Sequence, residues 1–199
     1  MAATRKEQQA LESRRRLVEA ASRLFAERGY RDASVQAIGE AAGVSRGSIF
    51  WHFGSKEGLL LAVVEQAFAR WETETLVPNV GDAVGLEAVR RGLAAHRAFV
   101  ESEGDGAQRL FFVLFFEALG PRPELLERFV ALHAHLRELA AGWLRAGDDV
   151  RDDVDPEGAA AMLVGALGGV AYQRLASPTL DLEATYGAMR ETFVRGLAA

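Results

Sequence analysis

The sequence predicts an all-α fold for a chain of 199 residues. Apolar residues recur every three to four positions through most of the chain, which is the spacing of one helix face. No stretch alternates apolar and polar residues with many β-branched side chains, as a half-buried strand does. Glycines, prolines and helix-capping residues stand between the periodic segments and predict where the helices end.

The N-terminal part predicts four helices in close succession. The first helix ends at Gly29. Ser34 is a good N-cap for a second, short helix that Gly43 ends. Ser45 is a good N-cap for a third helix, and Ser55 for a fourth. The apolar face of the first helix consists of Leu17, Ala20, Ala21, Leu24 and Phe25.

The rest of the chain predicts further helices and no strand. Pro78 and Gly81 are expected to end the fourth helix, because both residues break helices. Asp155 is a well-formed helix start, since an aspartate cap precedes a proline and an acidic residue in the first turn. Helical patterns cover residues 55–76, 83–101, 107–119, 123–146, 156–175 and 181–197.

Composition fits a globular protein and excludes several classes of site. Apolar residues make up 49% and charged residues 26% of the chain, which are ordinary globular values. The apolar run Gly158–Tyr172 is shorter than the roughly 20 residues that cross a bilayer, so no membrane span is expected. The N-terminus lacks the apolar core of an export signal, and a cytoplasmic protein is expected. Without cysteine there are no disulfides, thiolate zinc sites or cysteine nucleophiles.

Charge is distributed unevenly along the chain. Residues 1–60 contain ten Lys or Arg and seven Asp or Glu, a net charge of +3. Residues 61–199 contain 13 basic and 21 acidic residues, a net charge of −8. Only the N-terminal part is therefore suited to meet a polyanion.

The second and third helices form a helix-turn-helix pattern around the turn Ala42–Ser45. Glycine in this turn allows a left-handed backbone, and the serine begins the next helix. Such a motif places its second helix in the major groove of DNA. At 100° per residue, Ile49 points toward the first two helices. The opposite arc holds Arg46, Gly47, Phe50 and Trp51.

The stretch Arg16–Leu60, about a quarter of the chain, resembles the TetR family of bacterial repressors. Phe50 stands where the family usually has a tyrosine whose hydroxyl meets a phosphate, so only van der Waals contact is expected there. Gly39 replaces a usual alanine inside the second helix, which costs about 1 kcal/mol of helix stability. The resembling segments are Ala20–Phe25, Gly29–Tyr30, Ser34–Ile38, Ala41–Phe53 and Ser55–Leu60.

The resemblance implies two domains. Residues 1–54 are expected to form a three-helix helix-turn-helix DNA-binding domain, and residues 55–199 a helical effector-binding and dimerisation domain. The residues expected to contact DNA are Ser34, Gln36, Ser45, Arg46, Gly47, Ser48, Phe50, Trp51, His52 and Lys56.

Several of these contacts have alternatives. Arg46 is expected to read a guanine edge, with a phosphate contact or a solvated side chain as the alternatives. Gln36 contacts a base or a phosphate, or is a plain surface residue. Ser34 and Ser45 are expected to cap their helices, and either can contact a phosphate in addition. Trp51 and His52 are expected to contact phosphate or to pack at the helix junction.

Two basic features add to the DNA-binding prediction. Lys56 opposes the helix dipole at the first position of the fourth helix, and a phosphate partner would explain it. The arm before Leu17 contains Arg5, Lys6 and Arg14–Arg16. It is a solvated face or inserts into the minor groove.

The middle helices are candidates for an effector pocket. The segment 107–119 is apolar almost all round and must be buried on most sides. Such aromatic stripes are more often core than ligand site, but the resemblance implies an apolar effector pocket here, with His96, His133 or Gln173 as polar contacts. The expected ligand-binding residues are Phe68, Trp71, His96, Phe99, Leu110, Phe111, Leu114, Phe115, His133, Leu136, Trp143 and Gln173.

The last two helices are candidates for a dimer interface. Their glycines weaken a helix unless close packing offsets the loss. A core helix of the same chain could supply that packing, but the resemblance favours a four-helix bundle between two subunits. The expected interface residues are Met162, Leu163, Gly165, Ala166, Gly169, Met189 and Phe193.

Catalytic and metal chemistry find no support in the sequence. His133 and His135 lie about 200° apart around a helix and cannot bind one metal together. The acidic run 148–155 lacks the spacing of a calcium loop and is expected to be a solvated loop. There is no glycine-rich phosphate cradle and no nucleophile elbow. No enzyme activity, metal or cofactor is expected.

These patterns predict a homodimeric repressor that binds a palindromic double-stranded DNA operator and is released by a small hydrophobic effector. One alternative is an architectural DNA-binding protein without an effector, regulated by a protein partner. Another is an enzyme, which would need catalytic groups that converge in the cavity of the middle helices. No membrane partner is expected.

Overall fold

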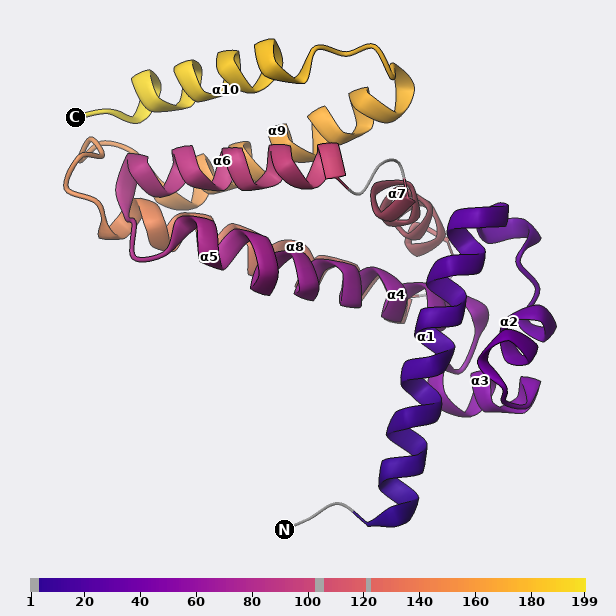
Figure 1. The fold of residues 1–199 in the computed structure, drawn as a ribbon. Helices are drawn as coiled ribbons and strands as arrows, with labels where there is room; N and C mark the ends of the chain where they lie inside the picture. Colours follow the sequence, from indigo (N-terminus) through magenta and orange to yellow (C-terminus); the bar gives the residue numbers. More distant parts are fainter. Residues whose placement is uncertain (1–3, 103–105, 121–122) are drawn as a thin grey trace. The chain divides into compact units, whose positions relative to one another are not determined.

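The computed structural model describes residues 4–102, 106–120 and 123–199 (Figure 1). Within these ranges every regular element is a helix. The one β feature among the described residues is an isolated antiparallel bridge between Val150 and Ala198. The all-α prediction is confirmed.

The helices follow the predicted order, with shifts of a few residues at their ends. The predicted break at Gly29 is a kink within α1, because its φ of 79° interrupts the helical backbone there and helical turns resume up to Asp32. Asp155 caps as predicted, and its carboxylate accepts from the N–H of Gly158 at 3.0 Å. The elements are α1 (Arg5–Asp32), α2 (Val35–Ala42), α3 (Arg46–Phe53), α4 (Lys56–Trp71), η1 (Glu72–Leu76), α5 (Val77–Val80), α6 (Gly85–Ser102), α7 (Gly106–Ala118), α8 (Pro123–Ala146), α9 (Pro156–Ala176) and α10 (Leu182–Leu197).

The prediction that Pro78 ends a helix is wrong. The helical path continues from α4 through the π-helical turn η1 into α5, and it ends only at Gly81. A π-helical turn shifts the hydrogen-bond register of the backbone. Pro78 then lies in the first turn of α5, directly after Val77, whose N–H bonds to the carbonyl oxygen of Glu72 across the π-helical turn.

The chain forms two compact units. The head unit contains residues 1–67 and 109–126, and the body unit contains residues 68–108 and 127–199. The helices α4, α7 and α8 each contribute residues to both units. The predicted functional boundary between residues 54 and 55 stays a prediction.

The head unit is held together by the predicted apolar faces of its helices. Leu17 of α1, Ile38 of α2 and Ile49 of α3 are fully buried. Leu59 and Leu60 add the first buried positions of α4. In Figure 1, α2 and α3 lie beside α1. Helix α2 packs against both α1 and α3. The three-helix arrangement therefore rests on side chains at helical spacing.

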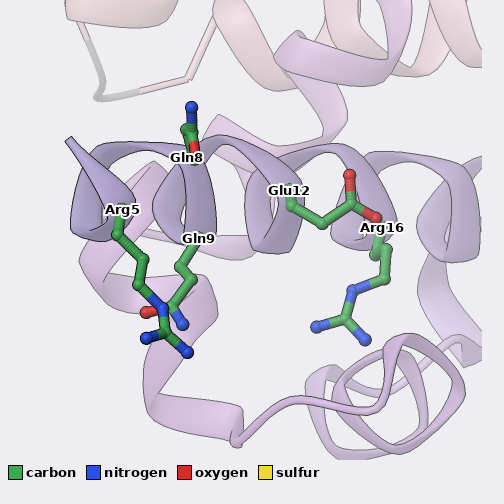
Figure 2. A pocket seen from close by; sticks show the side chains of 5 residues that line it. All are labelled: Arg5, Gln8, Gln9, Glu12 and Arg16. Carbon is green, nitrogen blue, oxygen red and sulfur yellow. The ribbon is translucent and has the colours of Figure 1, made fainter. Parts of the chain in front are cut away.

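The first turns of α1 extend beyond this core. A capping box starts the helix, because Thr4 Oγ1 accepts from the N–H of Glu7 while the Glu7 carboxylate accepts from the N–H of Thr4 at 2.7 Å. The side chains that follow, up to Arg16, stay outside the buried core, and five polar ones lie together. They line a hollow of about 520 Å³ (Figure 2), and these residues are Arg5, Gln8, Gln9, Glu12 and Arg16.

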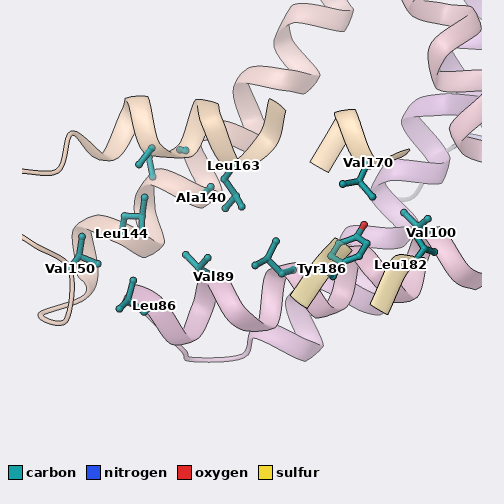
Figure 3. Packing of buried hydrophobic residues seen from close by; sticks show 14 residues of the cluster. Leu86, Val89, Val100, Ala140, Leu144, Val150, Leu163, Val170, Leu182 and Tyr186 are labelled. Atoms are coloured by element: carbon teal, nitrogen blue, oxygen red, sulfur yellow. The ribbon is translucent and has the colours of Figure 1, made fainter. Parts of the chain in front are cut away.

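The body unit has its own apolar core, which Figure 3 shows. Val89 of α6, Leu144 of α8 and Leu163 of α9 are buried together. Tyr186 of α10 joins them, and α6 packs against α10. The last two helices are therefore anchored to α6 and α8 by one side each.

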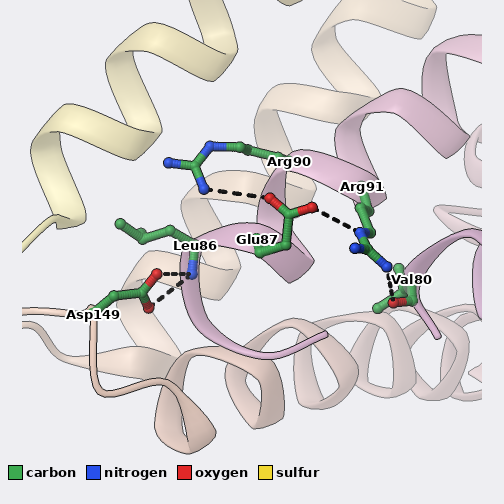
Figure 4. Close-up of polar contacts among 6 residues, drawn as sticks. All are labelled: Val80, Leu86, Glu87, Arg90, Arg91 and Asp149. Carbon is green, nitrogen blue, oxygen red and sulfur yellow. Dashed lines mark hydrogen bonds and ion pairs between the residues drawn. The ribbon is translucent and has the colours of Figure 1, made fainter. Parts of the chain in front are cut away.

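One acidic residue has a structural role that the sequence analysis did not predict. Asp149 belongs to the run expected to be a solvated loop, but its carboxylate accepts from the N–H of Leu86 at 3.1 and 3.3 Å (Figure 4). It thereby caps the start of α6 from a distant part of the chain. Glu87, in the same first turn, pairs with Arg90 and Arg91 on the helix surface.

By length and composition alone, α9 could cross a membrane. This differs from the expectation drawn from the shorter run Gly158–Tyr172. Core helices of soluble proteins pass the same test, and one side of α9 is buried in the body unit.

Candidate DNA-binding surface and effector site

The recognition helix α3 presents the predicted residues outward. Arg46 and Gly47 are exposed at its start. Phe50 is 46% exposed and Trp51 72% exposed, whereas Ile49 is fully buried. The Arg46 guanidinium lies 5.9 Å from the centre of the Phe50 ring, within cation–π distance. A small helix that exposes two large aromatic rings and an arginine has a surface suited to an external partner.

The turn before α3 has the predicted backbone. Gly43 adopts a φ of 65°, the left-handed conformation that glycine permits. Ser34 caps α2 as predicted, since its Oγ accepts from the N–H of Ala37 at 3.1 Å. The prediction for Ser45 is wrong in part, because it occupies the N-cap position of α3 but its Oγ lies 3.1 Å from Ser48 Oγ and makes no capping bond.

Two further predicted DNA contacts are already engaged within the head unit. Gln36 is exposed and donates to Glu40 at 3.0 Å. His52 Nε2 lies 2.6 Å from Ser13 Oγ of α1, and its ring packs edge-on against Trp51 at 4.4 Å. Partial burial lowers the pKa of His52, and the charge of Arg14 lowers it further. A neutral His52 therefore ties the recognition helix to α1.

Lys56 has a partner that the sequence analysis did not foresee. Its Nζ donates to the carbonyl oxygen of Arg31 at 3.2 Å and lies 4.5 Å from the centre of the Tyr30 ring. Partial burial lowers the pKa of Lys56, and the nearby carboxylates of Glu57, Asp32 and Glu117 act against that shift. These contacts at the end of α1 offset the unfavourable helix dipole, so the position of Lys56 does not require a phosphate.

The junction between α3 and α4 is closely packed at Gly58. A Cβ atom on this residue would lie 2.0 Å from the carbonyl oxygen of Phe53, the last residue of α3. Ser55 Oγ accepts from the N–H of Gly58 at 3.0 Å and caps α4 as predicted. The end of the recognition helix is therefore seated directly on the first turn of α4.

Part of the head unit is similar in sequence to known proteins. Residues 17–63 match the sequence model of the bacterial regulatory proteins of the tetR family. A solved structure described as the molecular basis for control of antibiotic production by bacterial hormones is 30% identical to this chain, with a TM-score of 0.68. Its alignment covers 94% of this chain and 97% of that chain. The chain belongs to the TetR family.

Other relatives extend the comparison of this TetR-family chain. The transcriptional repressor AcnR of Corynebacterium efficiens is 47% identical over 81 residues, which are 41% of this chain and 40% of AcnR. The chain therefore matches about two fifths of the length of that curated relative. The structure of FadR from Bacillus subtilis in complex with stearoyl-CoA is 22% identical, with a TM-score of 0.71, over 92% of this chain and 98% of that chain. The latter likeness shows the fold.

An aromatic cluster lies in the body unit of this TetR-family protein. Trp71 is 7% exposed, and its ring lies 6.2 Å from Phe68, 6.0 Å from His96 and 5.7 Å from Phe99. His96 Nδ1 lies 2.6 Å from the hydroxyl of Tyr186. Burial lowers the pKa of His96 to about 4 and raises the pKa of Tyr186. His96 is therefore neutral at pH 7, and its ring pairs with a protonated tyrosine.

Several buried side-chain polar atoms of the body unit make no hydrogen bond among the described residues. They include the indole Nε1 of Trp71 and both amide atoms of Gln108. Gln108 is only 4% exposed. A buried polar atom without a partner costs about 1–3 kcal/mol, so each is suited to a ligand or a water molecule.

The remaining predicted effector residues are spread over both units. Leu110 and Leu114 of α7 are buried in the head unit, where Phe111 and Phe115 are partly buried. In the body unit, Leu136 and Trp143 pack against the aromatic cluster, and the ring of His133 lies 4.7 Å from that of Phe129. Gln173 is exposed. The sequence analysis missed Tyr186 and Gln108, because a single sequence carries no signal for partners that are distant along the chain.

The predicted interface residues lie on α9 and α10 and differ in their exposure. Met162 is 68% exposed, and Gly165 and Gly169 are exposed with open space around the position of a Cβ atom. Leu163, by contrast, is buried in the body core, so the expectation that it faces a partner is wrong. The other expected residues, Ala166 of α9 and Met189 and Phe193 of α10, are partly buried.

Among the residues that the structure describes, no three His, Cys, Asp or Glu side chains lie close enough to hold a metal ion. His135 instead pairs with Glu72 at 2.9 Å.

Proposed function

We propose that this protein is a homodimeric transcriptional repressor that binds a palindromic DNA operator and is released by a small apolar effector. The observation that carries the proposal is the outward face of α3, where Arg46, Phe50 and Trp51 are exposed while Ile49 is buried. A helix-turn-helix with this orientation can insert its second helix into a major groove. The name of AcnR, a transcriptional repressor that is 47% identical to this chain over 81 residues, supports the same function.

The exposed side of α9 supports the homodimer. Met162, Gly165, Gly169 and Tyr172 follow one another at helical spacing, and all four are exposed. Glycines on an exposed helix face lower helix stability unless another backbone approaches them closely. A second copy of the same helix would bury this face and would bring two recognition helices into one molecule, as a palindromic operator requires.

The aromatic cluster of the body unit supports the effector. An apolar molecule with a hydrogen-bond acceptor would satisfy Trp71 Nε1 and gain burial from the surrounding rings. Trp71 is the last residue of α4, and Lys56, tied to α1, is the first. A shift of α4 caused by the effector would therefore act on the base of the recognition helix. Moving the equilibrium from 1:99 to 99:1 takes about 5.5 kcal/mol of differential affinity.

A rival function rests on a specific observation in the same cluster. The rings of Trp71, His96 and Phe99 contact one another, which is also the packing of a filled core. A filled core would favour a DNA-binding protein without an effector, regulated by a protein partner.

DNA binding is tested with Arg46→Ala, and Arg28→Ala of α1 serves as a matched exposed arginine outside the surface. A bidentate arginine–guanine contact contributes about 1–3 kcal/mol of discrimination. Against a duplex selected from a randomised library by the unaltered protein, Arg46→Ala should lose sequence preference more than affinity for random DNA. A uniform loss of affinity with the preference intact would contradict the role of Arg46.

The effector site is tested by thermal unfolding with matched probes. Acetophenone and ethylbenzene have similar size, but only acetophenone carries an acceptor for the Trp71 indole. Acetophenone should raise the melting temperature more, and Trp71→Phe should remove the difference. If neither probe changes the melting temperature, the cluster is a filled core and the rival function is favoured.

A further inference from the structure

The first turns of α1 form a helix that the apolar core does not require. From Arg5 to Arg16 the helix is about 18 Å long at 1.5 Å per residue, and none of these side chains is buried. The capping box at Thr4 and the ion pairs of Arg15 with Glu12 and Glu19 stabilise it instead. A helical extension that buries none of its side chains in the core has room for a role outside the fold.

This extension is attached to the recognition helix. Ser13 Oγ lies 2.6 Å from His52 Nε2. The Arg14 guanidinium lies 5.2 Å from the centre of the Phe53 ring. These contacts fix the extension to the end of α3, and it therefore moves with the surface proposed to read DNA.

One side of the extension is basic and hollow. Figure 2 shows Arg5, Gln9 and Arg16 extending to the same side of α1, whereas Gln8 extends to the opposite side. The spacing of four and then seven residues keeps these three on one helix face. They belong to the residues that line the hollow of about 520 Å³. We call Arg5, Gln9 and Arg16 the basic stripe.

The charges of the basic stripe are available to an anion. The one acid in the lining, Glu12, is taken up by Arg15, which donates to it at 2.7 and 3.0 Å. These hydrogen bonds, with the charges of Arg15 and Arg16, lower the pKa of Glu12. Arg5 and Arg16 form no ion pair among the described residues. The amide of Gln9 adds an uncharged donor between them.

The basic stripe is continuous with the helix-turn-helix. A Cβ atom on Gly43 would lie 3.5 Å from Nη1 of Arg16, so this guanidinium stands beside the turn that leads into α3. Arg5 lies three helical turns further along α1. An anionic partner that touches the turn and then runs along α1 must be extended and regularly charged, as a DNA backbone is.

We propose that the basic stripe binds the phosphates of duplex DNA that flanks the operator half-site read by α3. The inference rests on the proposed DNA-binding function and adds a second, sequence-independent contact for each subunit. Arg16 meets phosphates next to the helix-turn-helix, and Arg5 meets phosphates outside the sequence that α3 reads. The arm is thus a rigid helical clamp rather than a flexible strand inserted into the minor groove.

The test compares two duplexes in fluorescence anisotropy between 50 and 200 mM KCl. The first is a core of about 20 base pairs, selected from a randomised library by the unaltered protein, and the second carries added random flanks on both sides. Each phosphate contact contributes about 0.9 to the slope of log affinity against log salt. Arg5→Ala should lower the slope on the flanked duplex by about 1.8 for a dimer, roughly a tenfold smaller loss of affinity over this salt range.

Arg5→Ala should leave the core duplex unchanged, Arg16→Ala should weaken both duplexes, and Arg28→Ala, on another face of α1, should change neither. If Arg5→Ala binds the flanked duplex with the slope of the unaltered protein, or if the flanks add no affinity, the stripe is a solvated surface and the inference fails while the proposed function stands. If the unaltered protein binds no duplex at all, both fail.

Discussion

The contact between α3 and α4 at Gly58 gives a sharp mechanical prediction. An added Cβ atom would lie 2.0 Å from the carbonyl oxygen of Phe53, and real Cβ contacts are not shorter than 3.0 Å. In Gly58→Ala the end of α3 must therefore move away from α4 by about 1 Å. The neighbour is backbone, which cannot rotate out of the way as a side chain can.

The magnitude follows from two opposing effects. Overpacking of this kind costs about 1–3 kcal/mol. Alanine favours a helix over glycine by up to about 1 kcal/mol, which offsets part of that cost. Gly58→Ala should therefore lower the free energy of unfolding by about 1–2 kcal/mol. DNA affinity should fall further than the lost stability explains, because a displacement of about 1 Å breaks hydrogen bonds that need 2.7–3.2 Å.

The assay is urea unfolding followed by circular dichroism, together with anisotropy on the selected duplex where the variant is folded. The matched control is Gly142→Ala in α8, because a Cβ atom there meets nothing within 4 Å. It should be neutral or stabilising by up to about 1 kcal/mol and should leave DNA binding unchanged. If Gly58→Ala has the same free energy of unfolding and the same DNA affinity as the unaltered protein, the contact of α3 with α4 has no mechanical role.

Three further predictions concern the body unit. Asp149→Ala should lower the free energy of unfolding, measured in urea, by about 0.5–2 kcal/mol, because the N–H of Leu86 loses its hydrogen-bond acceptor. Asp149→Asn should retain part of this stabilisation. Equal stability of the unaltered protein and both variants would exclude the cap. His96 takes up a proton near pH 6.5 in the unfolded chain but only near pH 4 in the folded chain. Its contribution to the free energy of unfolding is therefore complete above pH 6.5 and falls toward pH 4 by up to about 1.4 kcal/mol per pH unit. Urea unfolding at pH 7 and pH 5 should show a smaller pH effect in His96→Gln, and an identical effect would refute the burial of a neutral ring. A Cβ atom on Gly169 would meet nothing within 4 Å in one chain, so Gly169→Ala should stabilise α9 by up to about 1 kcal/mol. The same variant should weaken the dimer, as measured by analytical ultracentrifugation. An unchanged dimer would contradict the proposed interface.

Local patterns were sufficient where a helix depends on its own neighbours. The caps at Ser34 and Asp155, the left-handed turn at Gly43 and the buried position of Ile49 all follow from residues within four positions of each other. The helical period and the cap are properties of one turn of backbone, so a single sequence contains them. The resemblance of the head to its family is carried by the same short-range pattern.

The same local rules did not identify partners that are distant in the sequence. The dipole argument at Lys56 called for a phosphate, but the carbonyl of Arg31 lies there after folding. His52 was expected to contact a phosphate or to pack at the helix junction, and only the fold shows that Ser13, 39 positions earlier, is its hydrogen-bond partner. In both cases the side chain is of the expected type, but the packing of α1 against the head decides what it touches.

The sequence by itself determined the helices of this protein, their caps and the outward side of the recognition helix, because each of these depends on contacts within one or two turns. Only the tertiary structure decided that Tyr186 pairs with His96 across 90 positions and that Asp149 caps α6 across 63. It also decided which side of α9 is left exposed and how α1 supports α3. Such pairings depend on which helix faces bury together, and no local period encodes that choice.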